Sequence, residues 1–171
     1  EDIETQPVAK LSKIGILVGP VRMALYLDRT DIVIRDSQNQ IRLADFSQWA
    51  GPLQENFSRV LAENLSVLLV THNVGIFPGT RAMSFDYNVT VDVTRFDGIP
   101  GEKADLRARW AILDKSRKEM LFENHSALSQ PTKDESMEAL IAAESRILSD
   151  LSREIAKAVK VLVEKGTPGK K

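Results

Sequence analysis

The sequence predicts an α+β fold within the α/β class: a single mixed, largely antiparallel sheet with two long helices packed on one face. Within residues 84–97, apolar and polar side chains alternate from Phe85 to Thr94, which is typical of a strand with one buried face. Residues 45–70 and 132–165 instead repeat apolar side chains at helical spacing. Because each of these three segments has a single apolar face, packing both helices on one side of the sheet buries all of them.

Three strands are expected before the first helix. Lys13–Val18 is largely apolar and is expected to end at Gly19-Pro20, a strong strand breaker. Asp31–Arg35 is β-branched and is followed by a turn sequence at residues 36–39. Gln40–Leu43 is therefore expected to return as the second strand of a hairpin.

The first helix is expected to begin at Asp45, whose carboxylate can accept hydrogen bonds from free N–H groups of the first turn. Gln48 stands three residues later, as in a capping box. Pro52 falls within the first two turns, where a missing N–H group costs least, and the helix is expected to end near Val70. The apolar residues at helical spacing are Trp49, Leu53, Phe57, Val60, Leu61, Leu65, Leu68 and Leu69.

An antiparallel meander and the second helix are expected to follow. Ser84–Asp97 turns back into Ala104–Asp114, and Glu119–Leu128 forms the third strand.

The second helix is expected to start in a capping box made by Thr132 and Glu135. Its acidic residues lead and its basic residues trail, as the helix dipole favours. Gly166 suits the C-terminal cap. Leu148 lies on the apolar face, so we expect it in the core.

Length and composition indicate one domain. The chain has 171 residues, of which 43% are hydrophobic and 27% charged, and this excludes a disordered or collagen-like protein. We expect residues 1–12 to form a flexible lead-in after a lipid anchor, 13–165 a single globular domain, and 166–171 a tail.

Charge, cysteine content and hydropathy exclude several classes of function. With 23 Lys+Arg and 24 Asp+Glu, the net charge of −1 gives no general attraction to nucleic acid, which is not an expected partner. The sequence has no cysteine, which excludes disulfides and thiolate chemistry. The longest apolar runs, Ile14–Val21 and Leu65–Val70, are far shorter than the ~18 residues that a membrane helix needs.

Residues that could support catalysis are scarce. His72 and His125 stand far apart, without metal-ligand spacing, and neither a nucleophile elbow nor a glycine-rich phosphate loop occurs. Asp86, Asn88 and Asp92 share one strand face. Neighbours on such a face lie about 6–7 Å apart, so a single strand cannot wrap a cation and a solvated face is expected. The sequence therefore predicts no catalytic residue, no metal and no cofactor.

One connection is more apolar than its position explains. Between Gly19 and Ile32 the chain holds Val21, Met23, Leu25, Tyr26 and Leu27. Such a connection either packs under the domain or offers a surface to a partner. Both interpretations stay open at this point.

Ordered blocks of residues recur from Val18 to about Ala158. They are Val18-Gly19-Pro20-Val21, Tyr26-Leu27-Asp28-Arg29, Ile32-Val33-Ile34-Arg35, Trp49-Ala50-Gly51-Pro52-Leu53, Arg59-Val60-Leu61-Ala62-Glu63-Asn64-Leu65, Val91-Asp92-Val93-Thr94-Arg95-Phe96-Asp97-Gly98, Ala108-Arg109-Trp110 and Ala142-Ala143-Glu144-Ser145. Together they resemble the signature of the ABC-type transport auxiliary lipoproteins, the PqiC-like family. The family usually has prolines just before and just after the Tyr-Leu-Asp-Arg block, where this chain has Ala24 and Thr30. Family members also begin with a signal peptide and a lipidated cysteine, so the resemblance implies a sequence that starts past the anchor.

The resemblance implies a lipoprotein of a Gram-negative bacterium, anchored on the periplasmic side of the outer membrane and soluble without its anchor. It would be a non-catalytic auxiliary subunit that works with an MCE-domain transport protein (PqiB-like) in moving lipids or other hydrophobic molecules between the membranes. It would support envelope integrity, and it could assemble as a homo-oligomer. One alternative is a periplasmic carrier that binds an apolar ligand in its own pocket. Another is an enzyme with an unfamiliar site.

We predict that the connection from Val21 to Arg29 is the main partner-facing surface, because Tyr and Arg are over-represented among the energetic anchors of interfaces. The competing interpretation is that the polar pair at its end only braces the strand that starts near Asp31. The predicted contacts are Tyr26 as the anchor, Leu25 and Leu27 as its apolar surround, and Asp28 and Arg29 as an orienting pair.

Overall fold

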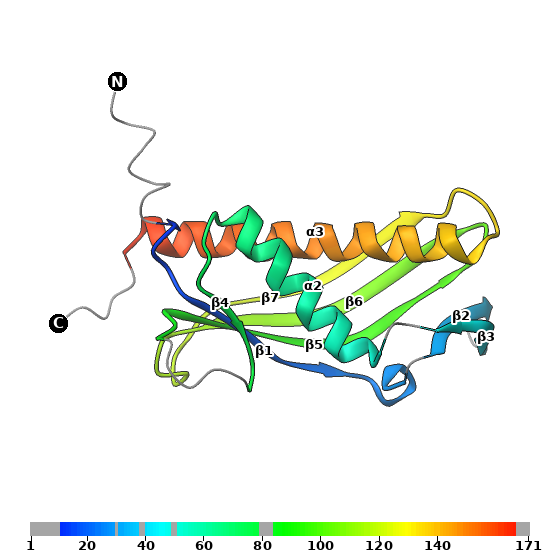
Figure 1. Ribbon diagram of the computed structural model, residues 1–171, viewed down its shortest axis with the longest axis horizontal. Coiled ribbons are helices and arrows are strands. Elements are labelled where there is room, and N and C mark those ends of the chain that lie inside the picture. The colour runs from blue at the N-terminus through cyan, green and yellow to red at the C-terminus, as the bar shows by residue number, and fades with distance from the viewer. Residues whose placement is uncertain (1–10, 30, 38–39, 49–50, 79–83, 167–171) are drawn as a thin grey trace, which may run out of the picture.

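The computed structural model describes residues 11–29, 31–37, 40–48, 51–78 and 84–166. It confirms the predicted fold class: two helices lie on one side of a long, curled, mixed sheet (Figure 1). The elements are β1 (Ile16–Met23), the 3-10 turn η1 (Leu25–Leu27), β2 (Asp31–Ser37), β3 (Gln40–Gln48), α2 (Leu53–Leu68), β4 (Val74–Ile76), β5 (Tyr87–Ile99), β6 (Lys103–Leu113), β7 (Met120–Pro131) and α3 (Met137–Glu164).

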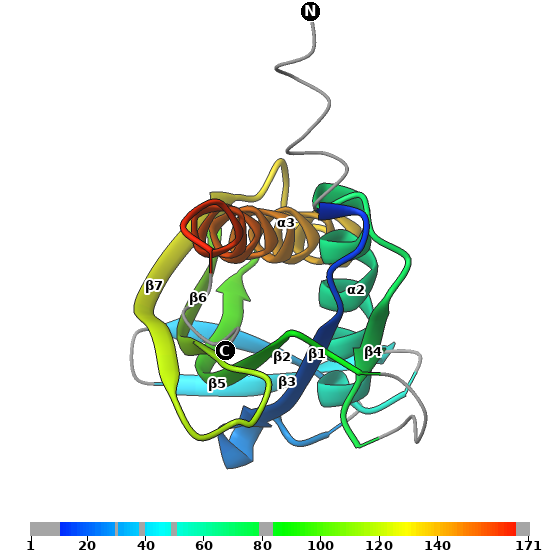
Figure 2. The same ribbon diagram turned by 90° about the vertical axis from the view of Figure 1, so that its left-hand side faces the viewer.

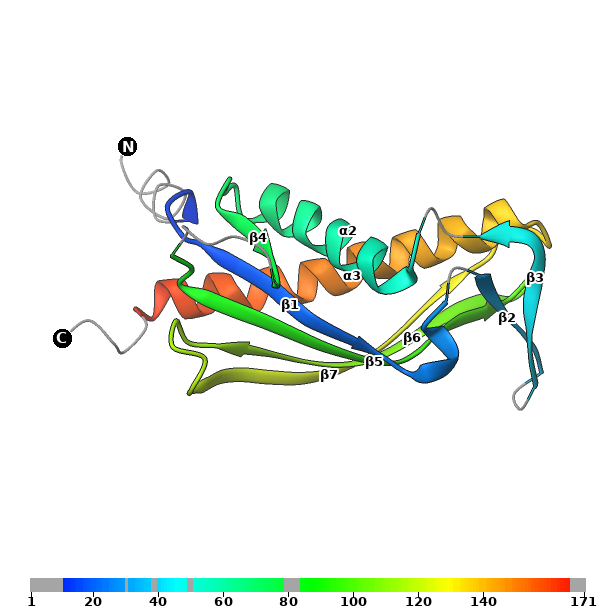
Figure 3. The same ribbon diagram turned by 60° about the horizontal axis from the view of Figure 1, so that its bottom comes forward.

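The long strand β5 organises the seven-stranded sheet. On one edge it pairs with β6, which pairs with β7, and this antiparallel meander is the one that the sequence predicts. On its other edge β5 pairs in parallel with β1 from Tyr87 to Val93, and then with β2 at Gly98. Strands β1 and β2 therefore lie one after the other along the same edge, and the chain between them forms η1 (Figure 3).

Strand β1 does not stop at Gly19-Pro20, so the predicted end of this strand is wrong. The register with β5 shifts between Val18 and Val21, which marks a β-bulge that contains the two breaker residues. A bulge leaves a residue outside the hydrogen-bonded ladder, and there a proline costs no ladder bond. Gly19 has a φ of +116°, which an L side chain rarely adopts, and β1 continues to Met23.

The first helix starts later than predicted, and Asp45 does not cap it. Residues 40–48 form β3, which pairs with β2 over Val33↔Leu43 and Arg35↔Ile41, so pairing takes up the backbone that the sequence assigns to a helix. Helix α2 begins at Leu53 with Pro52 as its N-cap residue. It ends at Leu68, close to the predicted position.

The second helix begins at Met137, and its cap is Ser136 rather than the predicted Thr132 with Glu135. The Ser136 hydroxyl accepts a hydrogen bond from the Ala139 N–H at 3.1 Å. The Thr132 N–H instead donates to the Glu102 carbonyl, which ties that residue to the β5–β6 turn. At the other end, Gly166 follows the last turn with a φ of +62°, as expected for a helix C-terminal glycine.

The core lies between the helices and the concave face of the sheet (Figure 2). Phe57 of α2 meets Phe96 of β5 edge to face, with ring centroids 5.7 Å apart. The indole N–H of Trp110 donates to the Ser126 hydroxyl, which in turn donates to Glu154 of α3, so β6, β7 and α3 are tied together. Leu148 is buried, as predicted. Within the part of the chain that the structure describes, neither helix has the length and hydropathy needed to cross a membrane.

Candidate partner-binding site

The turn η1 forms where the chain passes from β1 to β2 along the edge of β5. The Ala24 N–H donates to the Val93 carbonyl at 2.9 Å and extends the pairing with β5 by one residue. The Leu27 N–H then donates back to the Ala24 carbonyl at 2.9 Å, which closes the 3-10 turn. The position of this predicted site is therefore fixed by backbone hydrogen bonds at its start.

The five predicted contact residues point in different directions. Leu25 is 89% exposed, whereas Leu27 is buried in the core and cannot reach a partner. Tyr26 is half-buried, and its hydroxyl donates to an Asp97 carboxylate oxygen at 2.8 Å while it accepts from the Phe96 N–H.

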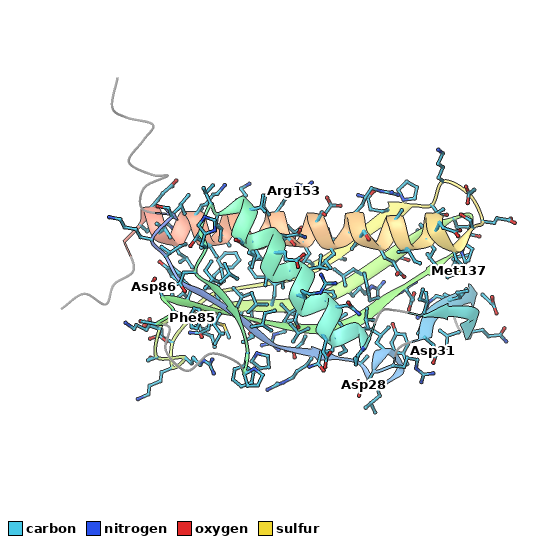
Figure 4. The ribbon with its side chains drawn as sticks, in the orientation of Figure 1. Asp28, Asp31, Phe85, Asp86, Met137 and Arg153 are labelled. Carbon is cyan, nitrogen blue, oxygen red and sulfur yellow. The ribbon has the colours of Figure 1, made fainter. Side chains whose placement is uncertain are left out.

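The polar pair that follows the turn lies at the surface. Asp28 and Arg29 are exposed, and Figure 4 places Asp28 at the outer edge of the molecule below β2. The Arg29 carbonyl accepts a weak hydrogen bond from the Leu53 N–H at 3.4 Å, so the backbone here also meets the start of α2. The segment thus presents one apolar side chain, Leu25, beside two charged ones.

Behind the turn lies a buried ionic cluster that sequence reasoning missed. The Asp97 carboxylate is fully buried and accepts two hydrogen bonds from Arg35, from Nε at 3.0 Å and Nη2 at 2.9 Å. Arg95 Nε also donates to it, at 3.2 Å. We call Tyr26, Arg35, Arg95 and Asp97 the Asp97 cluster. All four lie in blocks that resemble the family signature, which is the signal that could have singled them out.

The Asp97 cluster continues across the meander. Arg95 Nη2 donates to Asp105 of β6 at 3.0 Å, and the Ser129 hydroxyl of β7 donates to the same carboxylate. Side chains from η1, β2, β5, β6 and β7 therefore meet in one connected network. This network fixes the turn and β2 against the sheet.

Electrostatics keep the cluster in one charge state near neutral pH. Burial alone would raise the pKa of Asp97, but hydrogen bonds from Arg35 and Tyr26 outweigh it, so this pKa lies below its usual value. Burial and the hydrogen bond to Asp97 raise the pKa of Tyr26 to about 12. The Asp97 carboxylate is therefore charged and the Tyr26 phenol protonated, and the two are hydrogen-bonded to each other. The arrangement holds a surface in place and offers no free acid, base or nucleophile.

A second buried carboxyl lies on α3. Glu144 is buried, and its Oε2 has no hydrogen-bond partner among the described residues. Burial, with a smaller contribution from the negative charge of Asp97, raises the pKa of Glu144 well above its usual value. Glu144 is therefore held in its neutral form over a wider pH range than an ordinary glutamate.

Replacement of Glu144 by glutamine is expected to stabilise the protein at neutral pH and to change little at low pH. The pKa of Glu144 is higher in the folded than in the unfolded chain, so the stability that protonated Glu144 contributes is fully present below the unfolded pKa and is lost as pH rises through the folded pKa. Glutamine has no proton to lose, so the stability of Glu144→Gln relative to the native chain grows with pH, by at most about 1.4 kcal/mol per pH unit. Urea melts from acid to neutral pH measure it, with the exposed Glu164→Gln as the control. Equal midpoints for Glu144→Gln and the native chain at every pH would contradict this assignment.

The structure also places the other groups that the sequence singles out. His72 and His125 are exposed, and the residues described contain no group of three potential metal ligands. The predicted solvated face is wrong at Asn88, which is buried. Its amide donates to the Asp114 carbonyl at 2.7 Å and its oxygen accepts from Arg117 at 3.0 Å, so it fixes the β6–β7 turn. Asp86 accepts from the Gly15 N–H at 2.8 Å.

Comparison with known proteins gives one family match. A family model described as ABC-type transport auxiliary lipoprotein component matches residues 2–156. No curated protein matches the chain.

Several solved structures have a similar fold. A crystal structure of an uncharacterized protein has a TM-score of 0.73 at 19% identity, over 85% of this chain and 92% of that one. A protein from Xanthomonas campestris has a TM-score of 0.77 at 16% identity, over 91% and 88%. PelC from Paraburkholderia phytofirmans, described as a dodecamer, has a TM-score of 0.51 at 9% identity, over 82% and 87%. At these identities the likeness shows a shared fold.

Proposed function

The chain belongs to the family of ABC-type transport auxiliary lipoprotein components, and we propose on this basis that it is a non-catalytic subunit of an MCE-type ABC transport system. In this proposal it is lipid-anchored on the periplasmic side of the outer membrane of a Gram-negative bacterium. There it binds an MCE-domain protein (PqiB-like) and supports the movement of lipids or other hydrophobic molecules between the two membranes.

The observation that carries the binding role is the exposure of Leu25 on a fixed support. Leu27 on one side is anchored in the core, and Tyr26 is hydrogen-bonded to Asp97. An apolar side chain held in this way loses little conformational entropy when a partner covers it. Asp28 and Arg29 beside it form the polar rim that interface centres have. We therefore assign the anchor role to Leu25, and a supporting role to Tyr26.

Replacement of Leu25 by aspartate is expected to weaken pull-down of the MCE partner at least tenfold, about 1.4 kcal/mol, because a charge would enter an apolar contact. The melting temperature should stay within a few degrees, since Leu25 is 89% exposed. Val67→Asp is the matched control: Val67 is 77% exposed and apolar, but lies at the end of α2. If Leu25→Asp binds the partner as tightly as the native chain does, η1 does not belong to the interface.

The geometry favours this role over a carrier with its own apolar pocket. The space between the helices and the sheet is filled by large side chains, among them Trp110, Phe57, Leu61 and Leu106. A carrier needs a cavity for its ligand. Apolar ligand that co-purifies with the chain in stoichiometric amount would favour the carrier instead.

Self-association of this chain also belongs to the proposal. Its support is the fold alone, which the chain shares with PelC, described as a dodecamer. In such an assembly each copy would present its own Leu25 to the transport protein.

A further inference from the structure

We propose that the end of the molecule opposite Leu25 lies on a bilayer that contains anionic phospholipids. We call this end the membrane end; it comprises residues 11–14, residues 67–77, the β6–β7 turn at 114–119, and α3 from residue 157 onward. Figure 2 looks directly at it. The inference rests on the proposed function, because a lipid anchor attached ahead of residue 11 would bring this end to the membrane first.

Hydrogen bonds tie the start of the described chain to the end of α2. The Thr71 hydroxyl donates to the Ile14 carbonyl at 2.7 Å, and the Thr71 N–H donates to the Ser66 carbonyl at 3.1 Å. The Ile14 N–H donates to the Leu11 carbonyl at 3.2 Å. The last turn of α3 lies at the same end in both side views (Figures 1 and 3). The chain thus enters the domain beside the C-terminal ends of both helices.

The membrane end exposes apolar side chains that the core does not use. Val67 is 77% exposed and Val70 is 56% exposed, at the end of α2 and just after it. Phe77, after β4, is 39% exposed, and its ring lies 4.9 Å from the guanidinium carbon of Arg117. Side chains of this kind can enter the boundary between lipid headgroups and acyl chains, with a cation held at headgroup level.

The membrane end is also the basic end of a chain whose net charge is only −1. Its cations outnumber its acidic residues, and basic residues near a surface are attracted to anionic lipids. At the opposite end, around η1, β2, the β5–β6 turn and the start of α3, acidic residues outnumber basic ones. The cations of the membrane end are Lys13, Lys115, Arg117, Lys118, Lys157, Lys160 and Lys165, and its acidic residues are Asp114, Glu119 and Glu164. The acidic residues of the opposite end are Asp28, Asp31, Asp36, Glu102, Asp134, Glu135 and Glu138, and its cations are Arg29, Arg35, Lys103 and Lys133.

The two ends therefore suit different contacts. A contact with a protein partner would not require this separation of charge, whereas a bilayer with anionic headgroups fits an end that combines basic residues with exposed valines. Leu25 then points away from the membrane, toward a partner in the periplasm.

The first test measures which end faces the lipid. The sequence contains no cysteine, so a single introduced cysteine can carry a fluorophore without further changes. The chain is tethered by an N-terminal histidine tag to vesicles of phosphatidylethanolamine and phosphatidylglycerol with nickel-chelating lipid, and nitroxide lipids act as quenchers. We expect quenching at Val70→Cys at least threefold stronger than at Leu25→Cys. Equal quenching, or stronger quenching at residue 25, would overturn the inference.

The second test measures the charge requirement with the untethered chain. The double variant Lys118→Gln, Lys157→Gln is expected to bind the anionic vesicles about tenfold more weakly in a sedimentation assay. The matched control is the double variant Arg29→Gln, Lys133→Gln at the opposite end, which is expected to change binding less than twofold. Equal effects of the two double variants, or equal binding to purely zwitterionic vesicles, would contradict the proposal.

These outcomes are independent of the partner assay. A negative result with vesicles would overturn the membrane inference, and Leu25→Asp would still be expected to weaken the pull-down of the MCE partner. The proposed function fails if the native chain does not bind the MCE partner, whatever the vesicles show.

Discussion

Replacement of Asp97 by alanine is expected to lower the free energy of unfolding by about 3–5 kcal/mol. The carboxylate is fully buried, and its removal takes two hydrogen-bond acceptors from the guanidinium of Arg35, which is only 14% exposed. Arg95 and the Tyr26 hydroxyl lose the same acceptor. Breaking one partner of a buried charge pair is costly because the charge left behind is still kept from water.

Urea melts with a surface pair as the control measure this effect. Arg59 and Glu63 form an ion pair at 3.2 Å on α2, but their side chains are 55% and 63% exposed. Arg59→Ala is therefore expected to cost less than about 0.5 kcal/mol. A loss below about 1 kcal/mol for Asp97→Ala would mean that water replaces the carboxylate and that the Asp97 cluster is not what holds η1.

Replacement of Leu148 by alanine is expected to destabilise the protein by about 2–5 kcal/mol. Leu148 is only 6% exposed and belongs to the core between α3 and the sheet, so its loss removes buried apolar surface and leaves a cavity. Leu25→Ala is the control of the same chemistry, because Leu25 is almost fully exposed. Denaturant melts compare the two variants. A loss below about 0.5 kcal/mol for Leu148→Ala would place the apolar face of α3 elsewhere.

The elements with a long, regular pattern could be predicted from the sequence. The alternation in β5 and the helical spacing in α3 extend over many residues, and local periodicity decides both. The errors lie where a tertiary contact overrides a local signal. The bulge in β1 depends on its pairing with β5, and the strand that replaces the expected helix start at Asp45 depends on pairing with β2.

The candidate site could be located from the sequence, but its geometry could not. An apolar connection indicated the segment, yet nothing local distinguishes the exposed Leu25 from the buried Leu27 two residues later. The direction of Tyr26 depends on Asp97, which follows it by 71 residues. Arg35 and Arg95 complete the cluster from two further positions, and only the folded sheet brings the four together.

The attachment of the β2–β3 hairpin has a consequence for local stability. Along the described register, β2 pairs with β5 at Ile34↔Gly98, and the ion pair between Arg35 and Asp97 also joins the two strands. This ladder is much shorter than the ladders of the meander, so we expect the amide protons of β2 to exchange before those of β6. Asp97 joins this hairpin to η1, because its carboxylate binds Arg35 of β2 and also accepts a hydrogen bond from Tyr26. A ligand that binds η1 only while Tyr26 is bonded to Asp97 is therefore expected to slow hydrogen exchange in a hairpin that it does not touch.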